Sequence, residues 1–276
     1  MKLSIKTLVA VLVLFGAMAA GYFLFFSSDE FSAQANPAPA CQSAVFDKSA
    51  MVFDHVLICG TKGVPIEKLT HAAHVTAEWL DNDGDGLVDE PRLLEAFAQN
   101  KPTLIMSAEG ISLTAMPRIM TSLGDARVQD LYASETNPAD GARDAAQEEI
   151  HHLIMNASWQ TIFPEVFSEA ADDNSQLYQA WQLADQNRQY VYNDPTCDDS
   201  CKVTEFVYLA TAAYMETGAE LDLASDEMRL KTQAELFEAI PAMEQIFESA
   251  NYSYPTNHWP AGNYPFPENI EYFGVQ

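Results

Sequence analysis

The residues best able to do chemistry lie in one short stretch, Glu148-Glu149-Ile150-His151-His152. It places two carboxylates and two imidazoles at neighbouring positions of a segment that we expect to be a helix. Side chains three and four residues apart on a helix are neighbours, with Cβ atoms about 5–6 Å apart. Glu148 therefore faces His151 and His152, and Glu149 faces His152. Oxygen and nitrogen donors grouped in this way can hold a metal ion.

A further candidate ligand lies later in the chain. Glu205 is an acid near the start of the largely apolar segment 203–216, which we expect to be a helix. A carboxylate buried in such a helix needs a partner, and a metal ion is a suitable one. Glu205 is therefore the second place where the sequence indicates metal chemistry.

Taken together, the two segments resemble zincin-like metallopeptidases. The stretch 148–152 differs by one residue from the zinc-protease helix signature His-Glu-x-x-His, because Glu148 stands where the first His would be. The segment around Glu205 resembles the glutamate-bearing helix of the anthrax lethal-factor-like group within the gluzincins. The chain also resembles secreted bacterial proteins that combine an Asp-rich loop with a Glu-Glu-x-x-His helix, a likeness that implies no activity.

The zincin resemblance implies roles for individual residues. The implied metal ligands are Glu148, His152 and Glu205, and the implied general base toward water is Glu149. His151 has no role in that pattern and is kept as an additional candidate ligand. A Glu/His/Glu sphere is harder and more anionic than the usual zinc site, so it suits Mn²⁺ or Fe²⁺ as well as Zn²⁺. Its extra negative charge is expected to weaken the metal's pull on water and to lower peptidase activity.

Other interpretations of this helix stay open. Glu148-x-x-His151 and Glu149-x-x-His152 are each the Glu-x-x-His element of non-haem iron or manganese carboxylate proteins, and His71-x-x-His74 is the nearest second element. The helix is alternatively structural, in a catalytically inactive, calcium-stabilised binding protein. A buried Glu205 within reach of His152 favours the metal site, whereas a Glu205 far from that helix contradicts it. The candidates for stabilising an oxyanion in a hydrolase are His258, Tyr208 and Tyr214.

A separate acidic loop at 81–90 has the spacing of a calcium site, with a Gly at position 6 for the sharp turn. Position 12 is Arg92 instead of the usual bidentate Glu, so one of the last two acids must complete the coordination. The expected calcium ligands are Asp81, Asp83, Asp85, Leu87 through its carbonyl, Asp89 and Glu90. A single loop without a partner loop indicates a structural Ca²⁺ rather than a sensor.

The balance of charge narrows the possible partners. The chain of 276 residues has 40 acidic and 14 basic side chains and a net charge of −26. Such a surface repels nucleic acid and anionic lipid, so no nucleic-acid function is expected. A peptide or protein substrate is compatible with it.

The N-terminal sequence predicts a location outside the cytoplasm. Lys2 and Lys6 precede an apolar run at 8–26 that is long enough to span a bilayer. Residues 1–28 are therefore a signal peptide or a membrane anchor, and 29–40 a linker. Residues 41–276 form the single extracytoplasmic domain, either periplasmic, secreted or anchored through the N-terminal segment.

The cysteines also indicate an extracytoplasmic location, because all four follow the targeting segment and an even number suits an oxidising compartment. Three pairings are possible. We favour Cys41–Cys59 and Cys197–Cys201, since each closes a short local loop.

The pattern of apolar residues predicts an α+β fold. The resemblance to zincin-like metallopeptidases implies the zincin-like type of that class, in which a small sheet and the active-site helix precede a mainly helical half. The boundaries are an α+β half at 41–160, a helical half at 161–250 and an extended, aromatic and Pro-rich tail at 251–276. The expected strands are 51–59, 103–108 and 128–133. The expected helices are 65–80, 93–100, 111–123, 142–159, 176–190, 203–216, 226–237 and 241–249.

Overall fold

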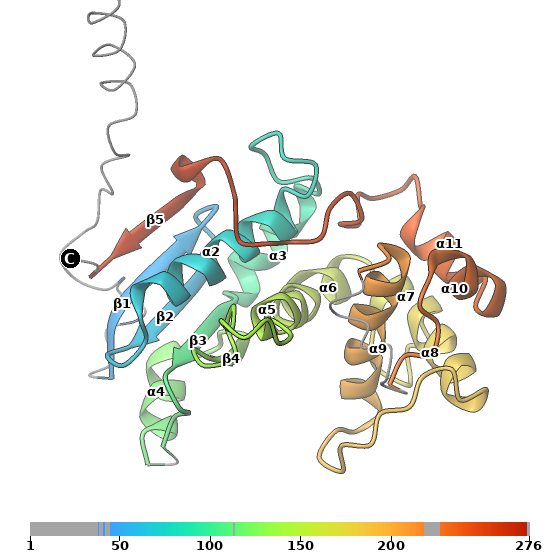
Figure 1. Cartoon of the computed structure of the whole chain (residues 1–276), viewed down its shortest axis with the longest axis horizontal. Helices are drawn as coiled ribbons and strands as arrows, with labels where there is room; N and C mark the ends of the chain where they lie inside the picture. Colours follow the sequence, from blue (N-terminus) through green and yellow to red (C-terminus); the bar gives the residue numbers. More distant parts are fainter. Residues whose placement is uncertain (1–37, 39–40, 42–44, 113, 218–226, 275–276) are drawn as a thin grey trace, which may run out of the picture. The chain divides into compact units, whose positions relative to one another are not determined.

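The computed structural model describes residues 38, 41, 45–112, 114–217 and 227–274 (Figure 1). All of these residues belong to the unit Ala33–Gln276. The expected signal peptide or anchor at 1–28 lies outside the described residues. Within the part of the chain that is described, no helix is both long and apolar enough to cross a membrane.

A five-stranded mixed sheet has the strand order β4-β3-β2-β1-β5. Its strands are β1 (Phe46–Val52), β2 (Val56–Thr61), β3 (Thr103–Ser107), β4 (Val128–Tyr132) and β5 (Ile270–Phe273). Strands β2, β3 and β4 run parallel, whereas β1 is antiparallel to both β2 and β5. Because the sheet is followed by a mainly helical half, the chain is α+β, as the sequence predicts.

The single strand expected over 51–59 is wrong. The chain turns back between Val52 and Val56, so that β1 and β2 form an antiparallel hairpin with these two residues paired. Phe53 and Asp54 in the turn have φ angles of 47° and 58°. Such left-handed conformations are usually marked by Gly or Asn, and their absence here concealed the turn.

Helices cover the sheet and build the second half of the chain. They are α2 (Ile66–Leu80), α3 (Arg92–Asn100), α4 (Met116–Leu123), α5 (Ala145–Ile154), α6 (Gln160–Ile162), α7 (Pro164–Phe167), α8 (Gln176–Gln186), α9 (Asp199–Tyr214), α10 (Gln233–Ala239) and α11 (Ala242–Phe247). Helix α5 continues through a π-helical turn, η2 (Met155–Trp159), into α6. Figure 1 shows α7 to α11 grouped beside the end of this long helical segment.

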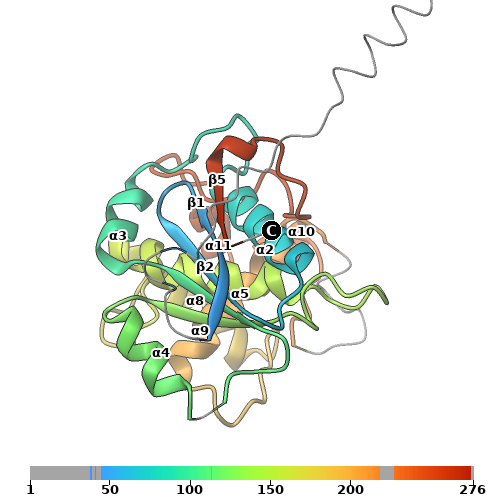
Figure 2. The same cartoon turned by 90° about the vertical axis from the view of Figure 1, so that its left-hand side faces the viewer.

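The sheet separates two apolar cores, because successive strand side chains point to opposite faces. Ile58 and Leu104 belong to the larger core, which α2, α5 and α9 share. Leu57 and Ile105 belong to a smaller core with α4. Figure 2 shows α2 and α4 on opposite sides of the strands. The larger core therefore joins the sheet to the helices that carry the candidate site.

The tail after α11 is extended, as predicted, but it ends as a strand that the sequence did not reveal. It runs back across the molecule (Figure 1) through the 3₁₀ turn η3 (Pro267–Asn269) to β5. Buried Glu78 on α2 accepts backbone N–H groups from residues 261–263. The Asn82 side chain likewise bonds the backbone at 257–258. These contacts fix the tail over α2.

Both expected cysteine pairs are confirmed as disulfides, Cys41–Cys59 and Cys197–Cys201. The first joins the segment before β1 to β2, and the second joins the loop before α9 to its first turn. Two disulfides suggest an oxidising, extracytoplasmic environment.

Candidate metal centre

The start of α5 is fixed by its N-cap, Asp144. Its carboxylate accepts hydrogen bonds from the backbone N–H of Asn137 at 2.7 Å and of Ala146 at 3.1 Å, and it contacts His71 Nε2 at 2.6 Å. An Asp at this position satisfies N–H groups that the first turn leaves without helical partners. Glu148 follows one turn later, so the cap fixes the first turn of the helix that positions Glu148.

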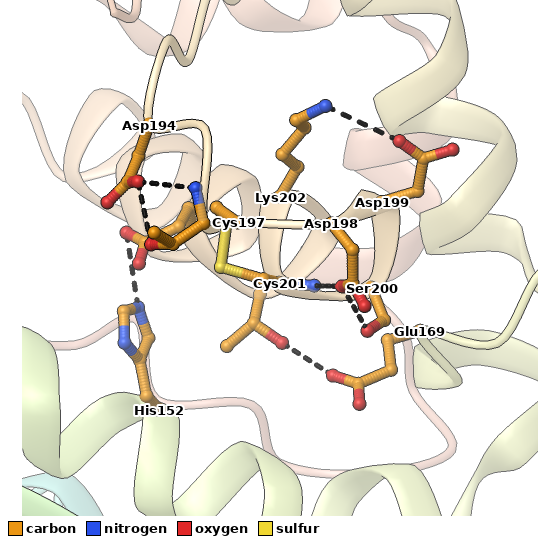
Figure 3. Close-up of a disulfide and its surroundings, with 12 residues drawn as sticks. His152, Glu169, Asp194, Cys197, Asp198, Asp199, Ser200, Cys201 and Lys202 are labelled. Atoms are coloured by element: carbon orange, nitrogen blue, oxygen red, sulfur yellow. Dashed lines mark hydrogen bonds and ion pairs between the residues drawn. A yellow bond between two sulfur atoms is a disulfide. The ribbon is translucent and has the colours of Figure 1, made fainter.

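The start of α9 is held in two ways. Asp198 caps the helix by accepting the N–H of Cys201 at 3.1 Å, and the Cys197–Cys201 disulfide closes the preceding loop. Glu205 lies one turn beyond Cys201. Figure 3 shows His152 rising from its helix toward this disulfide-linked start of α9. The cap and the disulfide thus hold Glu205 opposite α5.

Three of the predicted ligands meet between α5 and α9. Glu148, His152 and Glu205 each offer a ligand atom, and these atoms all lie within 4.8 Å of one another. His152 Nε2 is 3.7 Å from Glu205 Oε2. Glu205 is therefore within reach of His152, as the sequence requires for a metal site, and its side chain is partly buried.

Burial and like charge shape the electrostatics of this cluster. Burial, together with the neighbouring Glu148 carboxylate, raises the pKa of Glu205 to about 9. Burial lowers the pKa of His152 to about 4, an effect that Glu148 opposes and Arg143 strengthens. His152 is accordingly neutral at neutral pH, and the two acids repel each other when both are ionised.

These residues fit a divalent transition metal. His152 is 5% exposed, and its Nε2 atom is buried without a hydrogen-bond partner. A neutral imidazole nitrogen offers a lone pair to a metal, and a cation between the two carboxylates would relieve their repulsion. The donor set of one nitrogen and two carboxylates suits Zn²⁺, Mn²⁺ or Fe²⁺.

Glu149, the candidate base, lies beside the cluster. Its Oε2 atom is 3.8 Å from His152 Nδ1 and accepts a hydrogen bond from the side chain of Gln129 on β4. Burial and the Glu148 carboxylate raise the pKa of Glu149 to about 7, although the bond from Gln129 opposes the shift. A carboxyl group with a pKa near the working pH exchanges protons efficiently.

His151 lies outside the three-residue cluster. Its Nε2 atom is 2.9 Å from the hydroxyl of Tyr254 in the tail, and its ring packs against Trp79 and Tyr208. Burial lowers the pKa of His151 well below its usual value. These contacts place His151 in the core between α5 and the tail.

His71-x-x-His74, the nearest second element for a non-haem iron or manganese site, also lies outside the three-residue cluster. His71 contacts Asp144, and Glu78 bonds the backbone of the tail. Burial lowers the pKa of His74, and the neighbouring Glu78 opposes that shift. Among the described residues, neither histidine joins the three-residue cluster.

The three candidates for stabilising an oxyanion lie in different environments. Tyr208 is buried on α9 with its ring centroid 5.8 Å from that of His152. Tyr214 packs against Phe247 and lies 3.4 Å from Glu248 through its hydroxyl. His258 is exposed in the tail. Only Tyr208 of these three contacts a ligand of the cluster.

Arg143 is a residue of this site that the sequence did not reveal. It precedes α5, and its guanidinium lies 3.0 Å from Glu148 Oε2 and 5.3 Å from the centre of the Tyr208 ring. Its place in the turn before the helix puts it outside the spacing rules that relate residues on one helical face. The signal available in the sequence was a basic residue close to Glu148 in a strongly acidic chain.

The acidic loop gathers only part of its predicted set. Asp81, Asp83 and Asp89 have oxygen atoms within 4.8 Å of one another. Asp85 accepts the N–H of Leu87, whose side chain is exposed. Glu90 instead pairs with Arg92 and bonds Ser253 in the tail. Of the two acids considered for completing the coordination, Asp89 thus faces the loop.

Comparisons with family models, with curated proteins and with solved structures found no match for this chain. The resemblance to zincin-like metallopeptidases therefore depends on α5 and α9.

Proposed function

We propose that this protein is an extracytoplasmic metal-dependent hydrolase that acts on peptides or proteins. The observation that carries the proposal is the convergence of Glu148, His152 and Glu205 from two separate helices. Ionisable side chains are rarely buried together unless they are paired or bind a metal. Perturbed pKa values in such a cluster are typical of functional sites.

Each residue has a distinct task in this proposal. Glu148, His152 and Glu205 hold the metal, which when bound supplies a Lewis acid. Glu149 accepts the proton of the attacking water and returns it to the leaving amine. Gln129 orients Glu149 through its side-chain hydrogen bond. Tyr208 packs against His152 at the side of the cluster and is the candidate for polarising a substrate carbonyl.

An extended peptide is the substrate that the neighbouring sheet favours. Strand β4 is an edge strand and carries Gln129, the residue that contacts Glu149. An edge strand presents backbone N–H and C=O groups that a peptide can pair with. A peptide added along β4 would thus run beside the candidate base.

The acidic loop is proposed to bind a structural calcium ion through Asp81, Asp83 and Asp89. Oxygen ligands at close spacing are the preference of Ca²⁺. Burial, with help from Asp83, raises the pKa of Asp89 to about 6, and its Oδ1 atom is buried without a hydrogen-bond partner. A cation in the loop would compensate both effects.

Metal content and hydrolysis together test the proposal. The purified full chain, dialysed with calcium and a trace of transition metals, is expected to retain about one transition metal per chain. His152→Ala should lose that metal and all peptide hydrolysis but keep calcium. Glu169→Ala, which changes an acid outside the cluster that accepts a hydrogen bond from Thr204 on α9, is the control and should keep both. A wild-type chain that binds calcium alone would contradict the enzyme and favour the non-catalytic binding protein.

A further inference from the structure

Arg143 is held at the metal cluster by several partners. Besides its 3.0 Å contact with Glu148, its guanidinium packs over the Tyr208 ring and lies 4.0 Å from Glu227 Oε2. Its side chain is 32% exposed, so the charge is only partly screened by water. The guanidinium is thus placed against the carboxylate that replaces an imidazole in the ligand set.

The charges of the site explain why such a cation belongs there. Glu148 and Glu205 bring two negative charges, whereas two imidazoles and one carboxylate would bring only one. Arg143 offsets the charge of Glu148 in particular, because its guanidinium lies 3.0 Å from Glu148 and 4.0 Å from the more exposed Glu227. A guanidinium stays protonated at every accessible pH, so this compensation is permanent.

We propose that Arg143 is a positioning residue for Glu148 that also cancels its charge, so that the Glu148–Arg143 pair replaces a neutral ligand of the metal site. This inference rests on the proposed function. It reverses one expectation from the sequence, since the site keeps the net charge of a His/His/Glu site. The pair tunes the site toward divalent cations, because a pocket with one more negative charge would favour trivalent ions.

Competition between two cations tests this proposal. The full chain is loaded with Co²⁺, whose visible absorption reports on binding beside an imidazole nitrogen, and La³⁺ is then titrated to displace it. His152→Ala identifies the signal that belongs to this site. Arg143→Gln should raise the preference for La³⁺ over Co²⁺ by about tenfold, the scale of one partly exposed charge at close range. Arg143→Lys, which keeps the charge, should stay near wild type.

Two further variants keep the test decisive. Arg118→Gln removes an exposed arginine on α4 and should change nothing. Arg143→Met, which also removes the charge, should shift the preference toward La³⁺ in the same direction, and it decides the matter if Arg143→Gln does not fold. Equal loss of both ions in Arg143→Gln, with an unchanged ratio, would overturn the charge role. A wild-type chain without the His152-dependent Co²⁺ absorption would overturn the proposed function as well.

Discussion

The acidic loop and the helix-borne site both gather three potential ligands, yet different forces hold them. In the loop, Asp81 accepts N–H groups from Asp85 and Gly86 and the hydroxyl of Tyr264. Between α5 and α9, Glu205 lies 3.7 Å from His152 Nε2 and within 4.8 Å of a Glu148 oxygen. Asp81 is thus held by three hydrogen-bond donors, whereas Glu205 lies against another acid.

This difference indicates how each site depends on an ion. A carboxylate that accepts several hydrogen bonds keeps its position without a metal. Glu205, whose pKa is raised to about 9 by burial and by the Glu148 carboxylate, instead gains most from a cation. We therefore expect calcium to add stability to a loop that is already formed, and the transition metal to complete the helix-borne site.

The largest predicted effect concerns Glu149. Glu149→Gln should reduce peptide hydrolysis by about 10²–10⁴-fold, the range for loss of a general base, while the transition metal is retained. Activity assays and metal analysis on the same preparation measure both quantities. Loss of the metal in this variant would instead place Glu149 among the ligands, and unchanged hydrolysis would exclude it as the base.

The loop is tested by Asp81, which is fully buried. Asp81→Ala should lower the free energy of unfolding by about 2–4 kcal/mol even without calcium, because it removes the acceptor of three hydrogen bonds, one of them buried. It should also abolish the extra stability that calcium gives the wild-type chain. Denaturant unfolding with and without calcium checks both effects. Tyr264→Phe, which removes one of these donors, should cost only about 1 kcal/mol.

An intact calcium effect in Asp81→Ala would contradict the loop assignment. Loss of the transition metal in the same variant would show that the two sites are coupled, and so would weaken the comparison between them.

The smallest effect is a pH dependence at the start of α5. Burial would raise the pKa of Asp144, but the His71 contact and backbone N–H groups outweigh it and hold that pKa below its usual value. Asp144 therefore stabilises the fold above an unfolded pKa of about 3.9, and this stability is lost as the pH falls through the folded pKa. Asp144→Asn, which keeps a capping side chain, should cost about 1–2 kcal/mol at pH 7.

Unfolding free energies measured from pH 7 downward follow this difference. The gap between wild type and Asp144→Asn should shrink below about pH 4. A gap that stays constant with pH would mean that the charge of Asp144 has no part in the stability.

Local patterns predicted much of the fold. Apolar spacing located α2 and α9, and strands β3 and β4 were predicted within one residue at their ends. Strand β5 was missed because its four residues depend on pairing with the distant β1. The hairpin turn was missed because Phe53 and Asp54 adopt left-handed conformations without Gly.

Some residues of the candidate sites could likewise be found from the sequence, whereas others required the tertiary structure. Glu205 was found because an acid in an apolar helix is conspicuous in the sequence itself. Asp89 and Glu90 were equal candidates until the structure paired Glu90 with Arg92. Arg143 was missed because only tertiary structure brings its guanidinium to Glu148.

X-ray absorption spectroscopy at the edge of the bound transition metal tests the central claim most directly. For the full wild-type chain we predict a single metal environment with one imidazole nitrogen and carboxylate oxygens, and loss of the nitrogen signal in His152→Ala. A metal surrounded by oxygen alone, unchanged in His152→Ala, would place the ion in the acidic loop and contradict a site between α5 and α9.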